Sequence, residues 1–218
     1  MGGLCESQLG DSIEAVTRRD SALAQKVIER DAAIDALEQA IEADCVRVLA
    51  LRQPLAGDLR ETVGAMKIAV DLERVGDLAK NVAKRTLVLN REEPVKLTQG
   101  LSRMGRQALA QLKEVLDAYS STSPERALAV WRRDDEIDEL YNSLFREFLT
   151  YMMEDPRTIG TCTHLLFIAK NLERVGDHAT NIAEILYFRH TGRYIKDARP
   201  KSDVTSLTRF DFGSGEEK

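Results

Sequence analysis

Apolar residues recur every three or four positions along most of the chain, and one stretch of this pattern occurs twice. Residues 67–84 and 167–184 are identical at eleven of eighteen aligned positions when the offset is 100. Such spacing is typical of the buried face of a packed helix, so it predicts an internal helical repeat. The apolar positions are Ile68, Leu72, Val75, Ala79 and Val82 in the first copy and Ile168, Leu172, Val175, Ala179 and Ile182 in the second.

Residues that start and end helices divide the rest of the chain. Asp20 or Ser21 can cap a second helix that ends before Pro54, and Ser123 followed by Pro124 is typical of a helix start. A further break follows at Pro156. These signals predict an all-α chain of six helices, at residues 1–18, about 21–52, from 56 or 58 to about 90, 96–120, 124–154 and from beyond 156 to about 191.

The repeat places three helices in each half of the chain. A charged segment that contains a proline separates the halves, and the end of the chain is polar. We therefore expect a first half at residues 1–90, a linker at 91–94, a second half at 95–191 and a mobile polar tail at 192–218.

The start of the chain does not match the start of the second half. An offset of 103 aligns Asp31 with Asp134 and Met1 with Met104, whereas the fourth helix is expected to begin near Lys96. The first helix is therefore expected to lack its opening turns, through truncation or a misassigned start codon. Such a loss would make the first half the less stable half.

Each copy of the repeat also carries a polar stripe. Glu73, Asp77 and Asn81 lie four residues apart, as do Glu173, Asp177 and Asn181, so each set shares one helix face. The stripe is expected to line a groove or the surface. Neighbouring carboxylates repel, so they need a cation or a structural reason. An exposed ion-pair ladder of Asp71, Arg74 and Asp77 is one such reason, although residue 171 of the second copy is asparagine.

The second helix of each half adds another pair of carboxylates. Asp31 and Asp35 align with Asp134 and Asp138. Carboxylates from several helices suit Mg, Mn, Ca or oxidised Fe, and with water they can hold Zn. His178 follows Asp177 and could reach a metal, although a packed or solvated side chain is the commoner role of a helical histidine.

Several catalytic motifs are absent from the sequence. It contains no Glu-x-x-His, no HExxH, no GxSxG and no glycine-rich phosphate loop. Gly76 and Gly176 lie inside predicted helices, where we interpret them as points of close contact between helices. Cys5, Cys45 and Cys162 are widely spaced, which indicates reduced thiols in the core.

Composition narrows the class of protein. The chain has 218 residues and a net charge of −5, with both signs interspersed, which argues against nucleic-acid binding. Charged residues interrupt every apolar run before it reaches membrane-spanning length, and no signal peptide opens the chain. We therefore expect a cytoplasmic protein without membrane insertion.

Several segments resemble the PhoU family of bacterial phosphate-uptake regulators. These are LERVGDLAKNVAK and LERVGDHATNIAE, the RQP…DLR segment at 52–60, and the RDxxID-like elements at 30–35 and 133–138. The resemblance covers nearly the whole chain and implies two quasi-symmetric three-helix bundles. Some members hold multinuclear iron or zinc clusters through E/D-x-x-x-D motifs, and Mg or Mn stay open as alternatives. Here these motifs fall on Asp31, Asp35, Glu73, Asp77, Asp134, Asp138, Glu173 and Asp177.

The resemblance also implies a function. Members of the family are cytoplasmic, usually dimeric adaptors that restrain phosphate uptake and the phosphate-starvation response, acting on the ATPase subunit of the phosphate transporter and on the sensor histidine kinase. The alternative is a carboxylate-bridged metalloenzyme resembling a phosphohydrolase. Because the sequence offers no evident nucleophile, base or phosphate clamp, we expect a regulator without catalytic activity.

Overall fold

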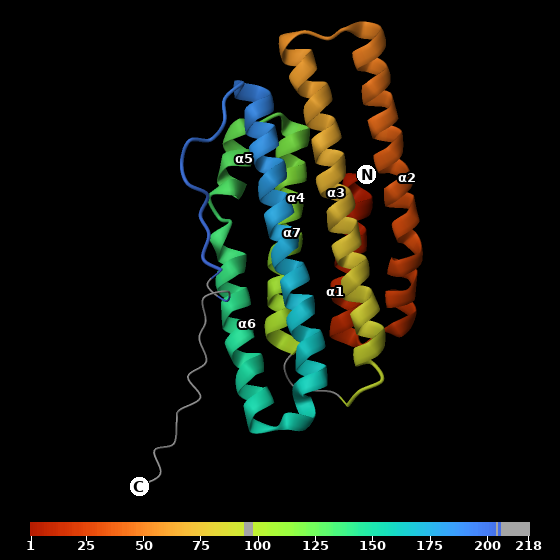
Figure 1. The fold of residues 1–218 in the computed structure, drawn as a ribbon, viewed down its shortest axis with the longest axis vertical. Helices are drawn as coiled ribbons and strands as arrows, with labels where there is room; N and C mark the ends of the chain where they lie inside the picture. Colours follow the sequence, from red (N-terminus) through yellow and green to blue (C-terminus); the bar gives the residue numbers. More distant parts are fainter. Residues whose placement is uncertain (94–97, 204, 206–218) are drawn as a thin grey trace.

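The computed structural model describes residues 1–93, 98–203 and 205. This part of the chain consists mainly of α-helices (Figure 1). The expected six helices are present, the fifth of them in two pieces. A short 3-10 helix, η1, precedes the last of them. The elements are α1 (Gly2–Arg18), α2 (Ser21–Arg52), α3 (Ala56–Leu89), α4 (Thr98–Ser121), α5 (Pro124–Trp131), α6 (Asp135–Glu154), η1 (Pro156–Thr158) and α7 (Ile159–Thr191).

The predicted helix starts have the expected local chemistry. The side chain of Asp20 accepts a hydrogen bond from the backbone N–H of Leu23 at 2.9 Å, and Ser123 caps α5 ahead of Pro124. These bonds satisfy amide groups that have no partner within the first turn of a helix. The expected start of the fourth helix at Lys96 lies outside the described residues.

The single helix predicted at residues 124–154 is wrong, because a turn at residues 132–134 divides it into α5 and α6. Tertiary contacts explain the break. Trp131 ends α5 and donates from Nε1 to Glu184 of α7 at 2.8 Å, while Asp134 turns toward Thr180 and Arg199. No proline or glycine marks the turn in the sequence, so local signals could not predict it.

The two halves of the chain form neighbouring bundles in contact through α3 and α7, which run side by side through the middle of the molecule (Figure 1). Helices α1 to α3 form one bundle and α4 to α7 the other, and α1 also packs on α4. The larger of two hydrophobic clusters extends through both, from Leu9 and Leu72 to Leu112 and Leu172, and a smaller one, with Val27, lies within the first bundle. The two repeats therefore share one interior.

Both glycines of the repeat mark close helix contacts, as predicted. A Cβ atom added to Gly76 would lie 2.9 Å from Cδ1 of Ile34, and one added to Gly176 would lie 2.8 Å from Cδ1 of Ile137. Ile34 and Ile137 are themselves matched by the offset of 103. The same contact therefore fixes α3 against α2 and α7 against α6.

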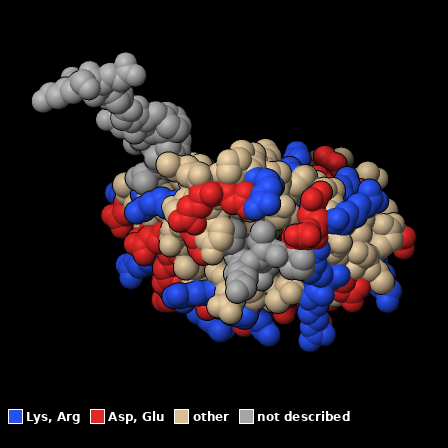
Figure 2. All heavy atoms as spheres, turned by 90° about the horizontal axis from the view of Figure 1, so that it is seen from below, with Lys and Arg blue, Asp and Glu red and all other residues tan. Residues whose placement is uncertain are grey.

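Helices α2 and α3 form a long hairpin that extends beyond the start of α1 (Figure 1). Because α1 has 17 residues and α2 has 32, much of α2 packs only on α3. Leu51 and Leu55 at the hairpin tip are 74% and 80% exposed. Seen from below, the described surface at the opposite end of the molecule carries interspersed positive and negative side chains (Figure 2).

Candidate functional site

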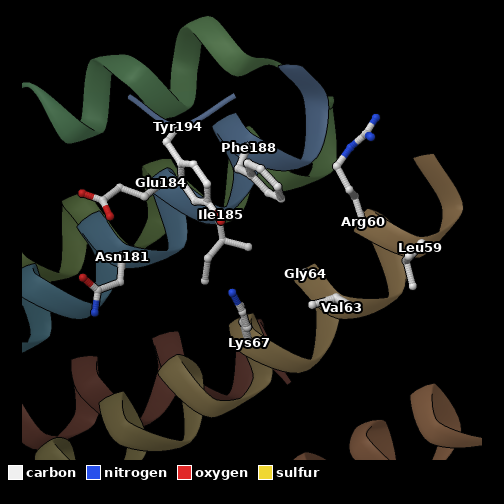
Figure 3. A pocket seen from close by; sticks show the side chains of 10 residues that line it. All are labelled: Leu59, Arg60, Val63, Gly64, Lys67, Asn181, Glu184, Ile185, Phe188 and Tyr194. Carbon is white, nitrogen blue, oxygen red and sulfur yellow. The ribbon is translucent and has the colours of Figure 1, made fainter. Parts of the chain in front are cut away.

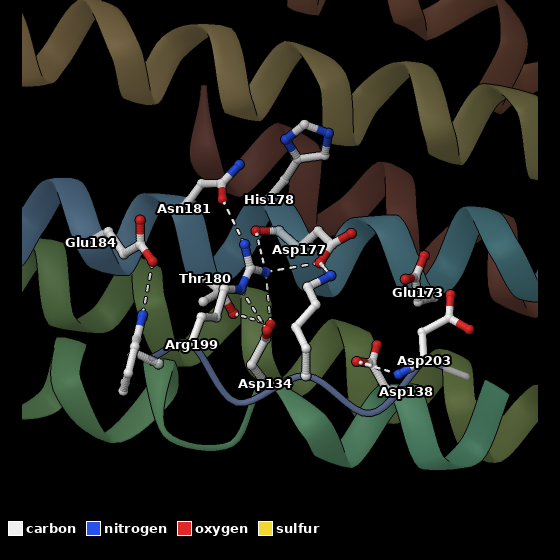
Figure 4. A network of polar contacts seen from close by, with 12 residues as sticks. Asp134, Asp138, Glu173, Asp177, His178, Thr180, Asn181, Glu184, Arg199 and Asp203 are labelled. Carbon is white, nitrogen blue, oxygen red and sulfur yellow. Dashed lines mark hydrogen bonds and ion pairs between the residues drawn. The ribbon is translucent and has the colours of Figure 1, made fainter. Parts of the chain in front are cut away.

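Four of the predicted carboxylates meet in the second half, where the start of α6 faces the middle of α7 (Figure 4). Asp134 directly precedes α6, Asp138 lies in its first turn, and Glu173 and Asp177 come from α7. Residues four apart share a helix face, so each pair is directed toward the other helix. The matched spacings thus produce one acidic cluster.

An arginine from beyond α7 joins the two pairs. Nε and Nη2 of Arg199 contact the two carboxylate oxygens of Asp134 at 2.5 and 2.8 Å, and Nη2 also contacts Oδ1 of Asp177 at 2.8 Å. The Thr180 hydroxyl donates to Asp134 at 2.7 Å. Since Asp134 is only 4% exposed, these bonds replace the water that its charge has lost.

The first half brings two of its matching carboxylates, Asp31 and Asp77, together around a lysine. Nζ of Lys80 contacts Oδ1 of Asp77 at 2.6 Å and also contacts Asp31. Burial lowers the pKa of Lys80, but its hydrogen bonds to these carboxylates outweigh that effect and raise the pKa above its ordinary value. Lys80 is therefore a firmly charged partner for both aspartates.

The glutamate of each cluster is a weaker acid than usual. Burial and the charge of Asp77 raise the pKa of Glu73, with a further contribution from Asp35. Burial and the charge of Asp177 likewise raise the pKa of Glu173, although Nζ of Lys170 lies 3.0 Å from its Oε2. In each half the glutamate thus holds its proton more readily because a neighbouring aspartate is charged.

The stripe lies largely where the sequence predicted. Five of its six residues are half-buried or exposed, as in a groove, and only Glu173 is buried, at 3% exposure. The aspartates that face it from the neighbouring helices, Asp31, Asp134 and Asp138, are buried at 2–4% exposure. The helix beside each stripe, α2 or α6, lies against it, and in the second half residues 199–203 cover it as well. Periodicity on one helix does not report what the next element covers.

The remaining polar residues of the repeat hold the two halves together. Nδ1 of His178 lies 2.8 Å from Oδ1 of Asp71, and Nδ2 of Asn181 lies 3.3 Å from the same oxygen. Asp71 therefore bonds across the α3–α7 interface, and the proposed ladder with Arg74 and Asp77 is replaced by other pairs. His178 points to α3 and has the structural role that we considered the commoner one.

Several residues of the clusters were missed in the sequence. They are Gln8, Lys80, Gln111, Thr180, Arg199 and Lys201. Buried Gln8 donates to Asp31 at 3.1 Å, and buried Gln111 donates to Thr180 at 3.3 Å. The offset of 103 aligns these two glutamines, so extending the repeat into the first helices could have found them.

A separate pocket of 380 Å³ lies between α3 and α7, beyond the second cluster (Figure 3). Its wall is mainly apolar, with Ile185 and Phe188 from α7 and Val63 from α3, and Arg60 and Lys67 also line it. No pattern in the sequence pointed to it.

Comparison with known proteins decides the family. The family model described as "PhoU domain" matches this chain twice, at residues 1–86 and 101–186. The chain belongs to the PhoU family. The two matches coincide with the two bundles and with the internal repeat.

Individual PhoU relatives align over most of their length. The chain is 56% identical to the phosphate-specific transport system accessory protein PhoU homolog of Caulobacter vibrioides (strain NA1000 / CB15N), over 94% of this chain and 90% of that protein. It is 39% identical to the phosphate-specific transport system accessory protein PhoU of Escherichia coli (strain K12), over 88% and 83%. These names describe accessory proteins, which agrees with the expected absence of catalytic activity.

Solved PhoU structures share the fold. The crystal structure of PhoU from Pseudomonas aeruginosa superposes with a TM-score of 0.86 at 41% identity, covering 88% of this chain and 93% of that one. The phosphate transport system regulatory protein PhoU from Streptococcus pneumoniae gives a TM-score of 0.83 at 32% identity, covering 89% and 92%. The all-α architecture of two repeated bundles is therefore that of the PhoU fold.

The metal cluster that the family resemblance implied would find suitable donor atoms here but not a suitable arrangement. All eight predicted ligands offer carboxylate oxygens, which hard cations prefer. Within the described residues, however, no group of three or more His, Cys, Asp and Glu side chains is placed to hold a metal ion. Lys80 and Arg199 instead occupy the carboxylates. Metal binding at these residues stays a prediction.

Proposed function

We propose that this chain restrains phosphate uptake and the phosphate-starvation response by binding the ATPase subunit of the phosphate transporter and the phosphate-sensing histidine kinase. The observation that carries this proposal is the match of both halves to the PhoU domain, together with relatives that are named accessory proteins of phosphate-specific transport. The site adds support, because its carboxylates bond to cations of the same chain and are not arranged around a reaction centre.

The α2–α3 hairpin offers a surface for such a partner. Leu51, Leu55 and Val46 are 74%, 80% and 53% exposed, at or near one end of the hairpin. Apolar side chains grouped on a surface in this way favour protein–protein contact. We assign docking of the transporter ATPase or the kinase to this tip.

A cytoplasmic homodimer is part of the same proposal. None of the described helices combines the length and hydrophobicity that a membrane crossing requires. Partners on the cytoplasmic side of the transporter would require this chain to be there too. The α2–α3 hairpin also presents apolar area on which a second copy could pack. The metalloenzyme alternative is not favoured, and a phosphatase assay on metal-loaded protein would test it directly.

A deletion strain tests the regulatory function. Loss of the gene should leave the phosphate-starvation genes switched on in high phosphate, and the intact gene should restore repression. Normal repression in the deletion strain would contradict the proposal. Pull-down from phosphate-replete cells, followed by identification of the captured ATPase or kinase, tests the partners separately.

The docking surface has its own matched variants. Leu51→Glu with Leu55→Glu should abolish capture of the partner and fail to restore repression, with helix content unchanged by circular dichroism. Met153→Glu is the control, because Met153 is equally exposed, at 74%, near the end of α6 in the other half. Equal loss in both variants, or in neither, would argue against the hairpin tip.

A further inference from the structure

Part of the segment beyond α7 lies on the second cluster, where residues 199–203 bond to its carboxylates. The expected mobility of the polar tail stays a prediction, and most of its later residues lie outside the described part of the chain. After Gly192, Tyr194 stacks on Phe188 with ring centroids 4.5 Å apart, at the wall of the pocket in Figure 3. The segment then runs along α6 to Asp203 (Figure 4). We call residues 199–203 the strap.

The strap is held by both its side chains and its backbone. Lys201 contacts Asp177 at 2.5 Å, and Lys170 contacts Asp203 at 2.8 Å. The backbone N–H groups of Ser202 and Asp203 both donate to Oδ2 of Asp138, at 2.9 and 3.2 Å. Each carboxylate of the α6 pair therefore accepts bonds from the strap, Asp134 from an arginine side chain and Asp138 from backbone N–H groups.

Comparison of the two halves explains why the strap is needed only in the second. Residue 80 is lysine in the first copy, and its equivalent at the offset of 100 is Thr180. Lys80 lies on α3 one turn from Asp77, so the cation is carried by the same helix as the carboxylate. In the second half Thr180 supplies a hydroxyl group, and Arg199 supplies the cation from outside the helix.

Because of this difference, another cation can replace the strap at the second site. The strap has no helical hydrogen bonds of its own within residues 199–203, and its lysine side chain is 42% exposed. Its release would leave Asp134 and Asp177 without the guanidinium that they now share. The carboxylates of Asp134 and Asp177 would then strongly favour binding of another guanidinium group.

We propose that the Asp134–Asp138–Asp177 site is a receptor for a cationic peptide segment, an arginine followed two positions later by a lysine, and that residues 199–203 are its intramolecular ligand. A partner segment of this chemistry binds by displacing the strap. The arginine takes the bidentate position on Asp134, and backbone N–H groups after the lysine bond to Asp138. The inference rests on these contacts and not on the proposed regulatory function.

A labelled peptide with the sequence of residues 197–203, DARPKSD, tests the receptor. The full chain is prepared as wild type and as the Arg199→Ala/Lys201→Ala variant, which empties the site. Because a short tether holds the strap at an effective concentration in the millimolar range, the variant should bind the peptide about tenfold more tightly than wild type in fluorescence anisotropy. Equal binding, or no binding to the variant, would overturn the proposal.

Matched variants establish where the peptide binds. In the Arg199→Ala/Lys201→Ala background, Asp177→Asn should abolish binding, whereas Asp77→Asn at the equivalent position of the first half should leave it unchanged. The peptide with alanine in place of its arginine should not bind. Equal effects of the two asparagine variants would show that the peptide binds elsewhere, and the assignment would fall.

Hydrogen exchange provides a measurement that does not depend on an added peptide. The amides of Ser202 and Asp203 should exchange about tenfold faster in Arg199→Ala than in wild type, because they lose Asp138 when the strap is released. Amides in the middle of α7 should be unaffected, which excludes general unfolding. Unchanged exchange at Ser202 and Asp203 would show that Arg199 does not hold the strap.

Discussion

His178 on α7 lies with its Nδ1 2.8 Å from a carboxylate oxygen of Asp71 on α3, so the two copies of the repeat bond to each other through positions at which they differ. The equivalent residues are Leu78 and Asn171. Divergence of the copies therefore produced one polar contact between the bundles.

This contact predicts a measurable coupling between the two side chains. Asp71→Ala and His178→Ala should each destabilise the protein, and a double-mutant cycle in urea should give a coupling of about 1 kcal/mol, as for a partly buried hydrogen bond. The exposed pair Glu14 and Arg18 on α1 is the control, with an expected coupling of about 0.3–0.5 kcal/mol. Equal couplings would indicate that the histidine contact adds nothing to the interface.

The close helix contact at Gly76 predicts that alanine there destabilises the protein, although alanine has the higher helix propensity. Gly76→Ala should lower the free energy of unfolding by about 1–2 kcal/mol, because the new methyl group meets fully buried Ile34 at 2.9 Å. Gly10→Ala in the middle of α1 is the control, since its nearest contact, Leu109, is at an ordinary 3.6 Å. It should stabilise by up to about 1 kcal/mol. Destabilisation of similar size in both would point to a general intolerance of alanine.

Metal binding by the carboxylates can be tested by removing the side chains that now pair with them, Lys80 and Arg199. If the carboxylates bind metal, protein purified without chelator should contain it, and the Asp77→Ala/Asp177→Ala variant should contain less. Lys80→Ala and Arg199→Ala should each raise the content, because each frees carboxylates that a side chain now occupies. Elemental analysis measures all four proteins. An absence of metal throughout, or contents that do not respond to these changes, would leave the clusters as ion-pair networks.

The cysteines predict a pH-dependent order of reaction. Burial raises the pKa of Cys5 to about 12, and its Sγ donates to the backbone carbonyl of Leu72 at 3.3 Å. At pH 8 only about one Cys5 in ten thousand carries the reactive thiolate. Cys45, 8% exposed, should react first with a thiol reagent, and Cys5 only after denaturant is added. Rapid labelling of Cys5 in native Cys45→Ser protein would contradict the buried environment.

Most of the fold could be predicted from the sequence because the packing pattern of this protein occurs twice. Apolar spacing located the helices, and the glycine at residue 76 or 176 indicated where helices touch. The matched spacing of the carboxylates indicated which helices bring them near one another, whereas their role as metal ligands stays a prediction. The turn before α6 escaped prediction because tertiary bonds of Trp131 and Asp134 cause it, and no local breaker does. Arg199 escaped because it lies in a segment without periodicity.

The core that runs without interruption from Leu9 to Leu172 determines how the molecule folds. Separation of the bundles would expose the apolar sides of α3 and α7 to water at the same moment, so neither half has a hydrophobic interior that is complete by itself. Unfolding in denaturant should therefore be one cooperative transition for both repeats. The two repeats therefore form a single folding unit, in which a destabilising substitution in either repeat also lowers the stability of the other.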